Sequence, residues 1–278
     1  MKNYVFAAIL AATAAAPAFA QEEEAASPFT VSGSVGLVTD YRYRGVSQSD
    51  QGMAVQGGFT VGHESGVYAG TWGSNLAGWG AFGGSNMELD FFAGVKVPVG
   101  VVTVDVGATY YFYPSGLPKT QFIEPYVKLG STLGPVSATL GLAYAPDQEA
   151  LGRVYNTGAA YAAGTPNNPG AKGDNLYIWT DLAGAIPETP VTLKAHLGYS
   201  KGNSGLGPNG TSVAPTGKYW DYSVGADLAL GKIVVGVSYI GTDISNADRQ
   251  YLAESMTNYR DGGNIAGGSL VGSVSVAF

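Results

Sequence analysis

The fold is decided by residues 29–45, which read FTVSGSVGLVTDYRYRG. Alternate positions of this stretch are apolar or aromatic: Phe29, Val31, Val35, Leu37, Tyr41 and Tyr43. Polar residues alternate with them: Thr30, Ser32, Ser34, Asp40, Arg42 and Arg44. Side chains two positions apart share one face of a β-strand, whereas a helix would scatter both sets around its axis. The stretch is therefore predicted to be a strand with one apolar and one polar face.

Eleven further segments alternate in a similar way. They cover approximately residues 54–64, 67–74, 86–97, 101–113, 121–132, 136–145, 176–185, 191–202, 219–230, 233–242 and 265–278. Most have the ~9–11 residues that a tilted strand needs to cross the hydrocarbon of a bilayer. Pro125 interrupts the segment 121–132, and a bulge or a strand end is expected there because proline cannot donate to a β-ladder.

The connections between these segments alternate between short and long. Five are short, and six are longer, including 146–175, 203–218 and 243–264, which are rich in Gly, Asn and Pro. Outer-membrane barrels have short periplasmic turns and longer outer loops. The sequence therefore predicts an all-β fold, an antiparallel up-and-down transmembrane barrel of twelve strands. Closing the sheet would pair every edge and satisfy the backbone inside the bilayer.

Aromatic residues gather near the long-loop ends of the predicted strands. They are Tyr41, Tyr43, Trp72, Tyr110, Phe112, Phe122, Tyr144, Trp179, Tyr199, Trp220, Tyr222 and Tyr239. Amphipathic rings favour the boundary between lipid and water. We expect these residues to form an outward-facing girdle; ordinary β-propensity of aromatic residues is the alternative.

Both ends of the chain carry export signals. Residues 1–20 have the features of a cleavable signal peptide: Lys2, an apolar run over 4–16, Pro17, and the small-x-small pattern ending at Ala20. The apolar run is too short for a membrane anchor, which needs ~20 residues. Cleavage would leave a periplasmic tail (21–28) and a barrel (29–278). The chain ends LVGSVSVAF, and such a strand closing on an aromatic residue, Phe278, predicts recognition by the barrel-assembly machinery and insertion into outer-membrane lipid of a Gram-negative bacterium.

The composition agrees with a membrane barrel. The chain has no cysteine, 42 glycines, 18 tyrosines, 45% hydrophobic residues and only 13% charged residues, whereas a soluble domain is about one quarter charged. No segment after the signal peptide approaches the ~18 consecutive apolar residues of a transmembrane helix. The net charge of −7 disfavours nucleic acid as a partner, because phosphate binding needs a basic surface.

Residues 37–75, LVTDYRYRGVSQSDQGMAVQGGFTVGHESGVYAGTWGSN, resemble the opening of the TorF-type porins, a family of bacterial outer-membrane proteins. ELDFFAGVKVPVG (88–100), VDVGATYYFYPSG (104–116) and WDYSVGADLALGKIVVGVSYIGTDIS (220–245) resemble later family segments in the same order. The resemblance implies an outer-membrane barrel with a pore. The insertion 146–175 departs from the family pattern, which leaves its contribution to gating or specificity open.

Catalytic, metal and cofactor sites are not expected. His63, Glu64 and Ser65 are suitable residue types, but neighbours on a strand point to opposite faces, and His196 fits an ordinary lumen residue. Asp243, Asp248 and Asp261 match no standard calcium loop, so solvated loop charge is the preferred interpretation.

Charged side chains remain for the predicted lumen. Its acids are Asp40, Glu64, Glu88, Asp90, Asp105, Glu124, Asp181, Asp221 and Asp227, and its bases are Arg42, Arg44, Lys96, Lys128 and Lys194. Nine acids against five bases predict a channel for small hydrophilic solutes or ions with weak cation selectivity. The alternative is a non-conducting structural or surface-binding barrel that acts through its outer loops, with its lumen plugged by its own side chains; an outer-membrane enzyme is a distant third.

Overall fold

The computed structural model describes residues 27–77, 81–210, 212–251 and 262–278. The predicted signal peptide and most of the predicted periplasmic tail lie outside these residues. Twelve strands form the barrel: β1 (Phe29–Val38), β4 (Ala54–His63), β5 (Val67–Asn75), β6 (Met87–Val99), β7 (Val102–Phe112), β8 (Phe122–Leu133), β9 (Val136–Gln148), β10 (Gly173–Ala185), β11 (Val191–Gly202), β12 (Lys218–Leu230), β13 (Ile233–Thr242) and β14 (Ser269–Ala277).

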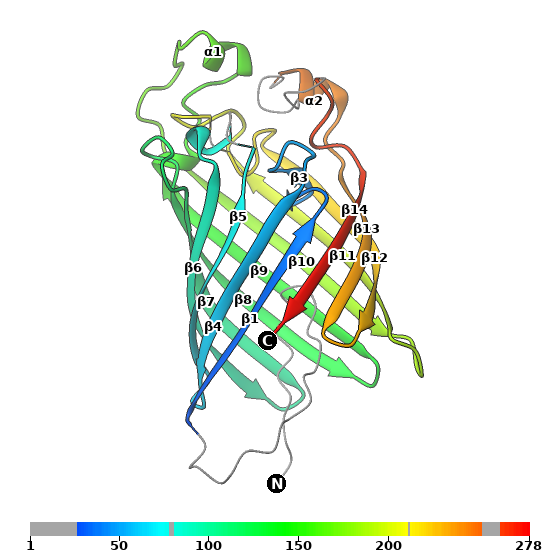
Figure 1. The fold of residues 1–278 in the computed structure, drawn as a ribbon. Coiled ribbons are helices and arrows are strands. Elements are labelled where there is room, and N and C mark those ends of the chain that lie inside the picture. Colours follow the sequence, from blue (N-terminus) through cyan, green and yellow to red (C-terminus); the bar gives the residue numbers. More distant parts are fainter. Residues whose placement is uncertain (1–26, 78–80, 211, 252–261) are drawn as a thin grey trace.

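Each barrel strand pairs antiparallel with its neighbour in sequence, and β1 closes the barrel by pairing with β14 (Figure 1). The closure begins where Gly33 and Phe278 exchange two backbone hydrogen bonds of 2.8 and 2.9 Å, and it continues to Val38 opposite Ser273. The predicted all-β, twelve-stranded antiparallel barrel is confirmed.

Short and long connections lie at opposite ends of this barrel. The longer connections carry the small elements β2 (Arg42–Tyr43), β3 (Val46–Ser47), η1 (Ala81–Gly84), η2 (Glu149–Leu151), α1 (Gly158–Ala162) and α2 (Asn246–Tyr251). The start of β1 and the C-terminus lie toward the other end, as Figure 1 shows. Among the described residues, no helix is both long enough and apolar enough to cross a bilayer.

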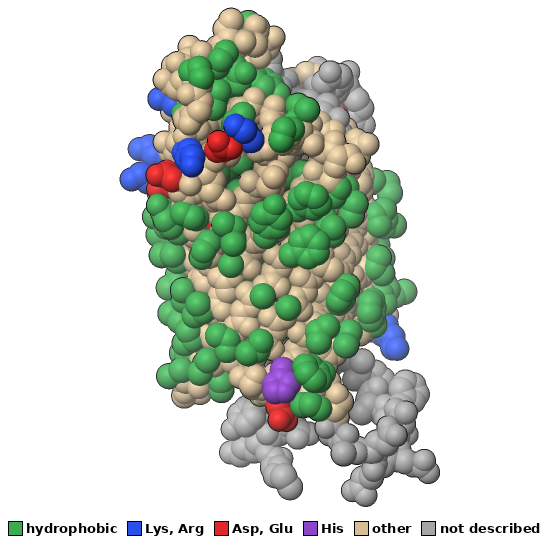
Figure 2. All heavy atoms as spheres, turned by 90° about the vertical axis from the view of Figure 1, so that its left-hand side faces the viewer, with side chains coloured by type: hydrophobic (Ala, Val, Ile, Leu, Met, Phe, Trp, Pro, Cys, Tyr) green, Lys and Arg blue, Asp and Glu red, His purple; other side chains and the backbone are tan. Residues whose placement is uncertain are grey.

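The wall is apolar outside and polar inside, as the alternation requires. The apolar outward residues of β1 are 45–67% exposed: Phe29, Val31, Val35 and Leu37. Together with similar residues on all the remaining barrel strands, they form an apolar outer surface (Figure 2). In lipid these side chains would be covered by acyl chains, since such barrels present an apolar band of about 25 Å to the membrane.

Inside the barrel, aromatic side chains extend over glycines of the adjacent strand. A Cβ atom added to Gly141 would overlap the ring of Trp179, and one added to Gly198 would overlap Tyr177. The same relation joins Phe92 with Gly70, Tyr68 with Gly94 and Tyr126 with Gly107. The many glycines of the sequence therefore make room for large inward side chains without widening the wall.

The predicted strand 29–45 is wrong beyond residue 38. β1 ends at Val38, and residues 39–53 turn into the barrel. Arg44 and Gly45 adopt left-handed backbone with φ of 47° and 79°, which no strand accommodates. Val38 and Thr39 interrupt the alternation where β1 ends, but the pattern resumes with Asp40, Tyr41, Arg42, Tyr43 and Arg44 and so hides the turn.

Pro125 causes neither a bulge nor a strand end. β8 pairs with β7 from Phe122 onward, but its ladder with β9 begins only at Tyr126. On the N-terminal side of Tyr126, the Gln148 side chain takes the place of the ladder: it accepts from the Ile123 N–H at 2.8 Å and donates to the Ile123 carbonyl at 2.9 Å. The proline thus interrupts pairing on one side only.

The connection between β9 and β10 is shorter than expected. Because β9 continues to Gln148 and β10 begins at Gly173, it covers residues 149–172 instead of 146–175.

The aromatic girdle is only partly as expected. Tyr110, Phe112, Tyr144, Tyr199, Trp220, Tyr222 and Tyr239 lie on the outer face, several of them in ring contact with one another. Tyr41, Tyr43, Trp72, Phe122 and Trp179 face the interior instead. For the residues on wall strands, strand parity decides this, because Trp72 shares its face with buried Ser74 and Phe122 shares its face with buried Glu124. Tyr41 and Tyr43 lie beyond the end of β1 and enter the barrel with residues 39–53.

Candidate functional site

The candidate site is the barrel interior together with the segment that enters it, residues 39–53, here called the lumen loop. Of the predicted lumen residues, Asp40, Arg42 and Arg44 come from this loop. The following come from the wall: Glu88, Asp90 and Lys96 on β6, Asp105 on β7, Glu124 and Lys128 on β8, Asp181 on β10, Lys194 on β11, and Asp221 and Asp227 on β12. All of these wall residues lie on the inward-facing positions of their strands. Glu64, expected in the lumen, instead lies exposed in the turn after β4.

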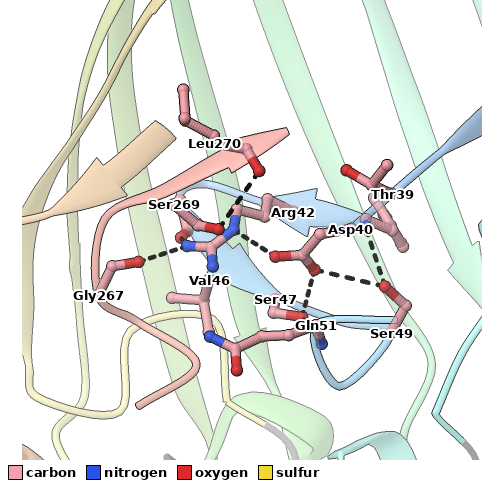
Figure 3. A network of polar contacts seen from close by, with 12 residues as sticks. Thr39, Asp40, Arg42, Val46, Ser47, Ser49, Gln51, Gly267, Ser269 and Leu270 are labelled. Carbon is pink, nitrogen blue, oxygen red and sulfur yellow. Dashed lines mark hydrogen bonds and ion pairs between the residues drawn. The ribbon is translucent and has the colours of Figure 1, made fainter. Parts of the chain in front are cut away.

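An internal network gives the lumen loop its shape (Figure 3). The Asp40 carboxylate accepts from Arg42 Nε at 2.7 Å and from Ser47 Oγ at 2.6 Å. Arg42 Nη1 donates to the carbonyls of Gly45 (2.9 Å) and Gly267 (2.6 Å), which ties the loop to the segment before β14. The Asp40 and Arg42 side chains are only 4% and 1% exposed, so the pair is shielded from bulk water.

On one side, the lumen loop packs against β5, β6 and β7. The Tyr41 hydroxyl donates to Glu88 Oε2 at 2.9 Å. The Tyr41 ring packs edge-on against Trp72, with 5.4 Å between the ring centroids. The Tyr43 ring meets Tyr111 at 5.8 Å. Burial, together with the nearby carboxylate of Glu88, raises the pKa of Tyr41, so its hydroxyl remains a neutral donor.

On the far wall, Arg44 reaches β8 and β10. Its Nη2 lies 2.7 Å from both carboxylate oxygens of Glu124, and its guanidinium carbon lies 3.9 Å from the ring centre of Tyr177. Burial disfavours the charged guanidinium, but the Glu124 carboxylate outweighs this and raises the pKa of Arg44. The arginine therefore stays cationic inside the barrel.

Gly45 completes the crossing on the β12 and β13 side. A Cβ atom there would lie 2.6 Å from Thr242 Cγ2 and 3.0 Å from Asp221 Cβ. Only glycine combines this close approach with the φ of 79°. The lumen loop therefore contacts the wall on several sides and forms a constriction across the barrel.

Below this constriction, toward the short turns, residues of opposite charge lie across from one another on neighbouring strands. Asp105 stands between Lys96 and Lys128 in the strand register, and its carboxylate accepts from the Tyr68 hydroxyl at 2.5 Å. Lys128 Nζ lies 4.0 Å from the ring centre of Tyr126. Alternating charges at this position brace the wall and leave polar groups facing the interior.

A second group centres on His196. Its Nδ1 lies 2.6 Å from Asp181 Oδ1, and its Nε2 lies 3.0 Å from Asp221 Oδ1 and 2.9 Å from the Tyr177 hydroxyl. Nearby, Lys194 and Asp227 form an ion pair of 2.7 Å.

Sequence reasoning placed these charged residues on inward positions but missed Tyr177, Trp179, Tyr68 and Asn175. Their spacing by two from inward residues of the same strand is the signal that could have identified them.

Glu88 and Asp90 form an acidic pair near the constriction. They are 2% and 7% exposed, and Glu88 accepts from Tyr41. Within the described residues, Asp90 Oδ1 is buried without a hydrogen-bond partner. Without Glu64, the inward acids are eight against five lysines and arginines, so the expected negative excess becomes smaller but keeps its sign.

The residues considered for chemistry elsewhere are explained by local structure. His63 Nδ1 and Ser65 Oγ lie 2.8 Å apart, a contact that was not expected from residues on one strand. Both residues belong to the turn region at the end of the barrel with the short connections, and the Ser65 N–H also donates to His63 Nδ1. Asp243 accepts from the Trp220 N–H and Asp248 from the Ser245 hydroxyl, while Asp261 lies outside the described residues. Among the described residues, no group of three or more His, Asp or Glu side chains is arranged so that it could hold a metal ion.

One family model matches most of the chain. The sequence model of a family described as "Bacterial protein of unknown function (Gcw_chp)" matches residues 22–262. Its description does not mention TorF-type porins, so that finer assignment remains a prediction. No curated protein matches the chain.

Similar solved structures include a porin refined at 1.8 Å resolution, with a TM-score of 0.40, 10% identity, and coverage of 90% of this chain and 100% of that chain. Outer-membrane expressed OmpT of Vibrio cholerae has a TM-score of 0.40 and 8% identity, with 90% and 97% coverage. The anion-selective porin from Comamonas acidovorans has a TM-score of 0.36 and 9% identity, with 90% and 98% coverage.

Proposed function

This chain belongs to the Gcw_chp family of bacterial proteins of unknown function, and we propose that it is an outer-membrane channel through which small hydrophilic solutes or ions diffuse passively. The proposal includes weak cation selectivity, an outer-membrane location after removal of residues 1–20, and no enzymatic activity. It keeps the resemblance to TorF-type porins as the finer family assignment.

One observation carries the proposal: a closed barrel whose inner wall bears charged and hydroxyl side chains both beside a loop constriction and between it and the short turns. Lys96, Asp105, Lys194 and Asp227 lie well away from the lumen loop, where an apolar filling would pack better if the interior were only a core. Twelve strands lie between small barrels filled by side chains and the wide porins of 16–18 strands. A water path narrowed by the lumen loop fits both the strand number and the polar wall.

Liposome swelling tests the proposal. Vesicles that contain the refolded protein should swell in small polar solutes, and the rate should fall steeply as solute size increases. Vesicles with an equal mass of heat-denatured protein provide the control. Swelling no faster than the control, for the smallest solutes, would reject a channel.

The second candidate is a non-conducting barrel that acts through its outer loops. The contacts of Tyr41, Arg44 and Gly45 with separate parts of the wall favour it, because together they place one loop across the lumen. This candidate predicts no solute flux from the wild-type protein. It also predicts that truncation of the lumen loop creates a flux that was absent before.

A further inference from the structure

The contacts of Arg44 describe a binding site as well as a structural link. We propose that the lumen holds a guanidinium site formed by Glu124, Tyr177 and Asn175, which Arg44 fills in the resting state and which a guanidinium-bearing solute fills in its place. This inference deepens the proposed function, on which it rests, by naming a class of solute that the channel recognises.

The geometry matches a planar guanidinium group in three independent ways. The Glu124 carboxylate binds one edge through Nη2, with both oxygens at 2.7 Å. With its amide oxygen facing Arg44, Asn175 accepts from Nη1 at 2.8 Å, while its nitrogen donates to Ser200 Oγ and to the Lys201 carbonyl. The Tyr177 ring lies 3.9 Å from the guanidinium carbon and covers its face.

These contacts discriminate between kinds of cation. A guanidinium presents donors on two edges and a flat, weakly hydrated face that stacks on aromatic rings. A primary ammonium is compact and strongly hydrated, so it could pair with Glu124 but could not at the same time stack on Tyr177 and reach Asn175. The site should therefore prefer guanidinium compounds to amines of equal charge.

The site is built on the wall and does not depend on the loop that fills it. Glu124 lies on β8, and Asn175 and Tyr177 lie on β10. The Tyr111 hydroxyl donates to the Glu124 carboxylate at 3.3 Å and helps to hold it. The Tyr177 hydroxyl donates to Asp221 at 3.1 Å. Removal of the Arg44 side chain should therefore leave the carboxylate, the amide and the ring in place.

The lumen loop also has other anchors and would stay inside the barrel. Tyr41 binds Glu88, and Arg42 binds Asp40 and Gly267. The backbone of Arg44 itself is unfavourable for an arginine, because its φ of 47° suits glycine or asparagine better. Contacts of its side chain are thus the main reason for an arginine at this position.

Chemical rescue tests the site directly. In the purified Arg44→Ala protein, ethylguanidinium restores the missing group, and ethylammonium is the matched control cation. The readout is the temperature at which an unboiled sample loses its folded gel mobility. At an ethylguanidinium concentration about tenfold above its Kd, the folding equilibrium of the variant should shift by about elevenfold toward the folded state.

Three comparisons make the result specific. Ethylammonium should give a markedly smaller shift, the wild type should respond little because Arg44 fills its site, and Arg44→Ala combined with Glu124→Gln should not respond. Equal responses to the two cations, or a response that survives Glu124→Gln, would overturn the proposal. If Arg44→Ala does not fold, Arg44→Gly, which the φ of 47° suits better, serves as the second variant under the same criteria.

A second measurement separates this site from the proposed channel. In planar bilayers, ethylguanidinium should reduce the current through Arg44→Ala more strongly than ethylammonium does. Rescue of stability without any current in either protein would support the site and reject the channel. Current without rescue or selective block would support the channel and reject the site.

Discussion

Arg44 and Glu124 come from different sides of the barrel and meet inside it, with Nη2 of the arginine 2.7 Å from both oxygens of the carboxylate. The lumen loop carries Arg44 from between the adjacent strands β1 and β4, whereas β8 lies on the other side of the closed sheet. Their side chains are only 5% and 4% exposed. This pair fixes how far the loop extends into the lumen.

Replacement of Glu124 by glutamine should destabilise the barrel strongly. Removal of one charge from a buried pair typically costs about 3–5 kcal/mol, because the remaining charge stays buried without its partner. Glu149→Gln is the matched control, since Glu149 pairs with Lys119 at 3.3 Å while both side chains are 44–52% exposed. Such a pair contributes about 0–1 kcal/mol. The gel-shift unfolding temperature measures both variants, and equal losses would contradict a buried link.

Gly141→Ala should destabilise the barrel through Trp179. The new Cβ atom would overlap the indole ring, whose Nε1 donates to Asp181 at 3.0 Å. Overpacking of this kind typically costs about 1–3 kcal/mol. Gly130→Ala is the control, because it lies on an inward strand position with no atom within 4 Å of its Cβ. The same unfolding assay distinguishes them, and a loss as large in Gly130→Ala would show that ring packing is not the cause.

Neutralisation of Glu88 and Asp90 together should shift ion selectivity toward anions. The two carboxylates are buried beside the constriction, where single-sign charge on a low-dielectric wall attracts counter-ions. Asp243→Asn is the control, because Asp243 is exposed at the start of an outer connection. The reversal potential across a bilayer under a salt gradient reports the change. The shift should shrink at about 1 M salt, where the Debye length is about 3 Å. An anion-selective wild type would contradict the proposed polarity of the lumen.

Cysteine labelling tests the orientation in the membrane. The chain has no cysteine, so Gly164→Cys in the connection 149–172 and Gly231→Cys in the turn before β13 can each be labelled alone. A membrane-impermeant thiol reagent on intact cells should modify the first variant only, since long connections face outward in such barrels. Modification of Gly231→Cys alone would reverse the orientation.

Period-two alternation sufficed to predict the barrel because burial against lipid and exposure to the interior act on every strand independently. Residues 29–38 and 270–278 show this most clearly, and the structure pairs them at the closure. Alternation failed at Tyr41 and Tyr43, where it persists although the chain has left the wall. What moves these residues inward is contact with Trp72, Glu88 and Tyr111, which lie far away in the sequence.

The guanidinium site lay beyond reach of the sequence for a related reason. Arg44 and Glu124 were both assigned to the lumen, but the 80 positions between them give no sign that they meet. Their contact depends on the strand order, on the turn allowed by Gly45, and on the side of β10 that Tyr177 occupies. The side of β10 on which Tyr177 lies follows from the local sequence only when it is known which alternate positions of that strand face inward.

Single-channel conductance in a planar bilayer tests the central claim most directly. The wild-type protein should give discrete current steps of uniform size, because a closed barrel narrowed by a fixed loop has one pore size. A variant in which a short glycine-serine linker replaces residues 41–50 should give clearly larger steps, since that segment carries Tyr41, Arg44 and Gly45. Absence of current from the wild type and from the shortened variant would contradict a water-filled channel in this barrel.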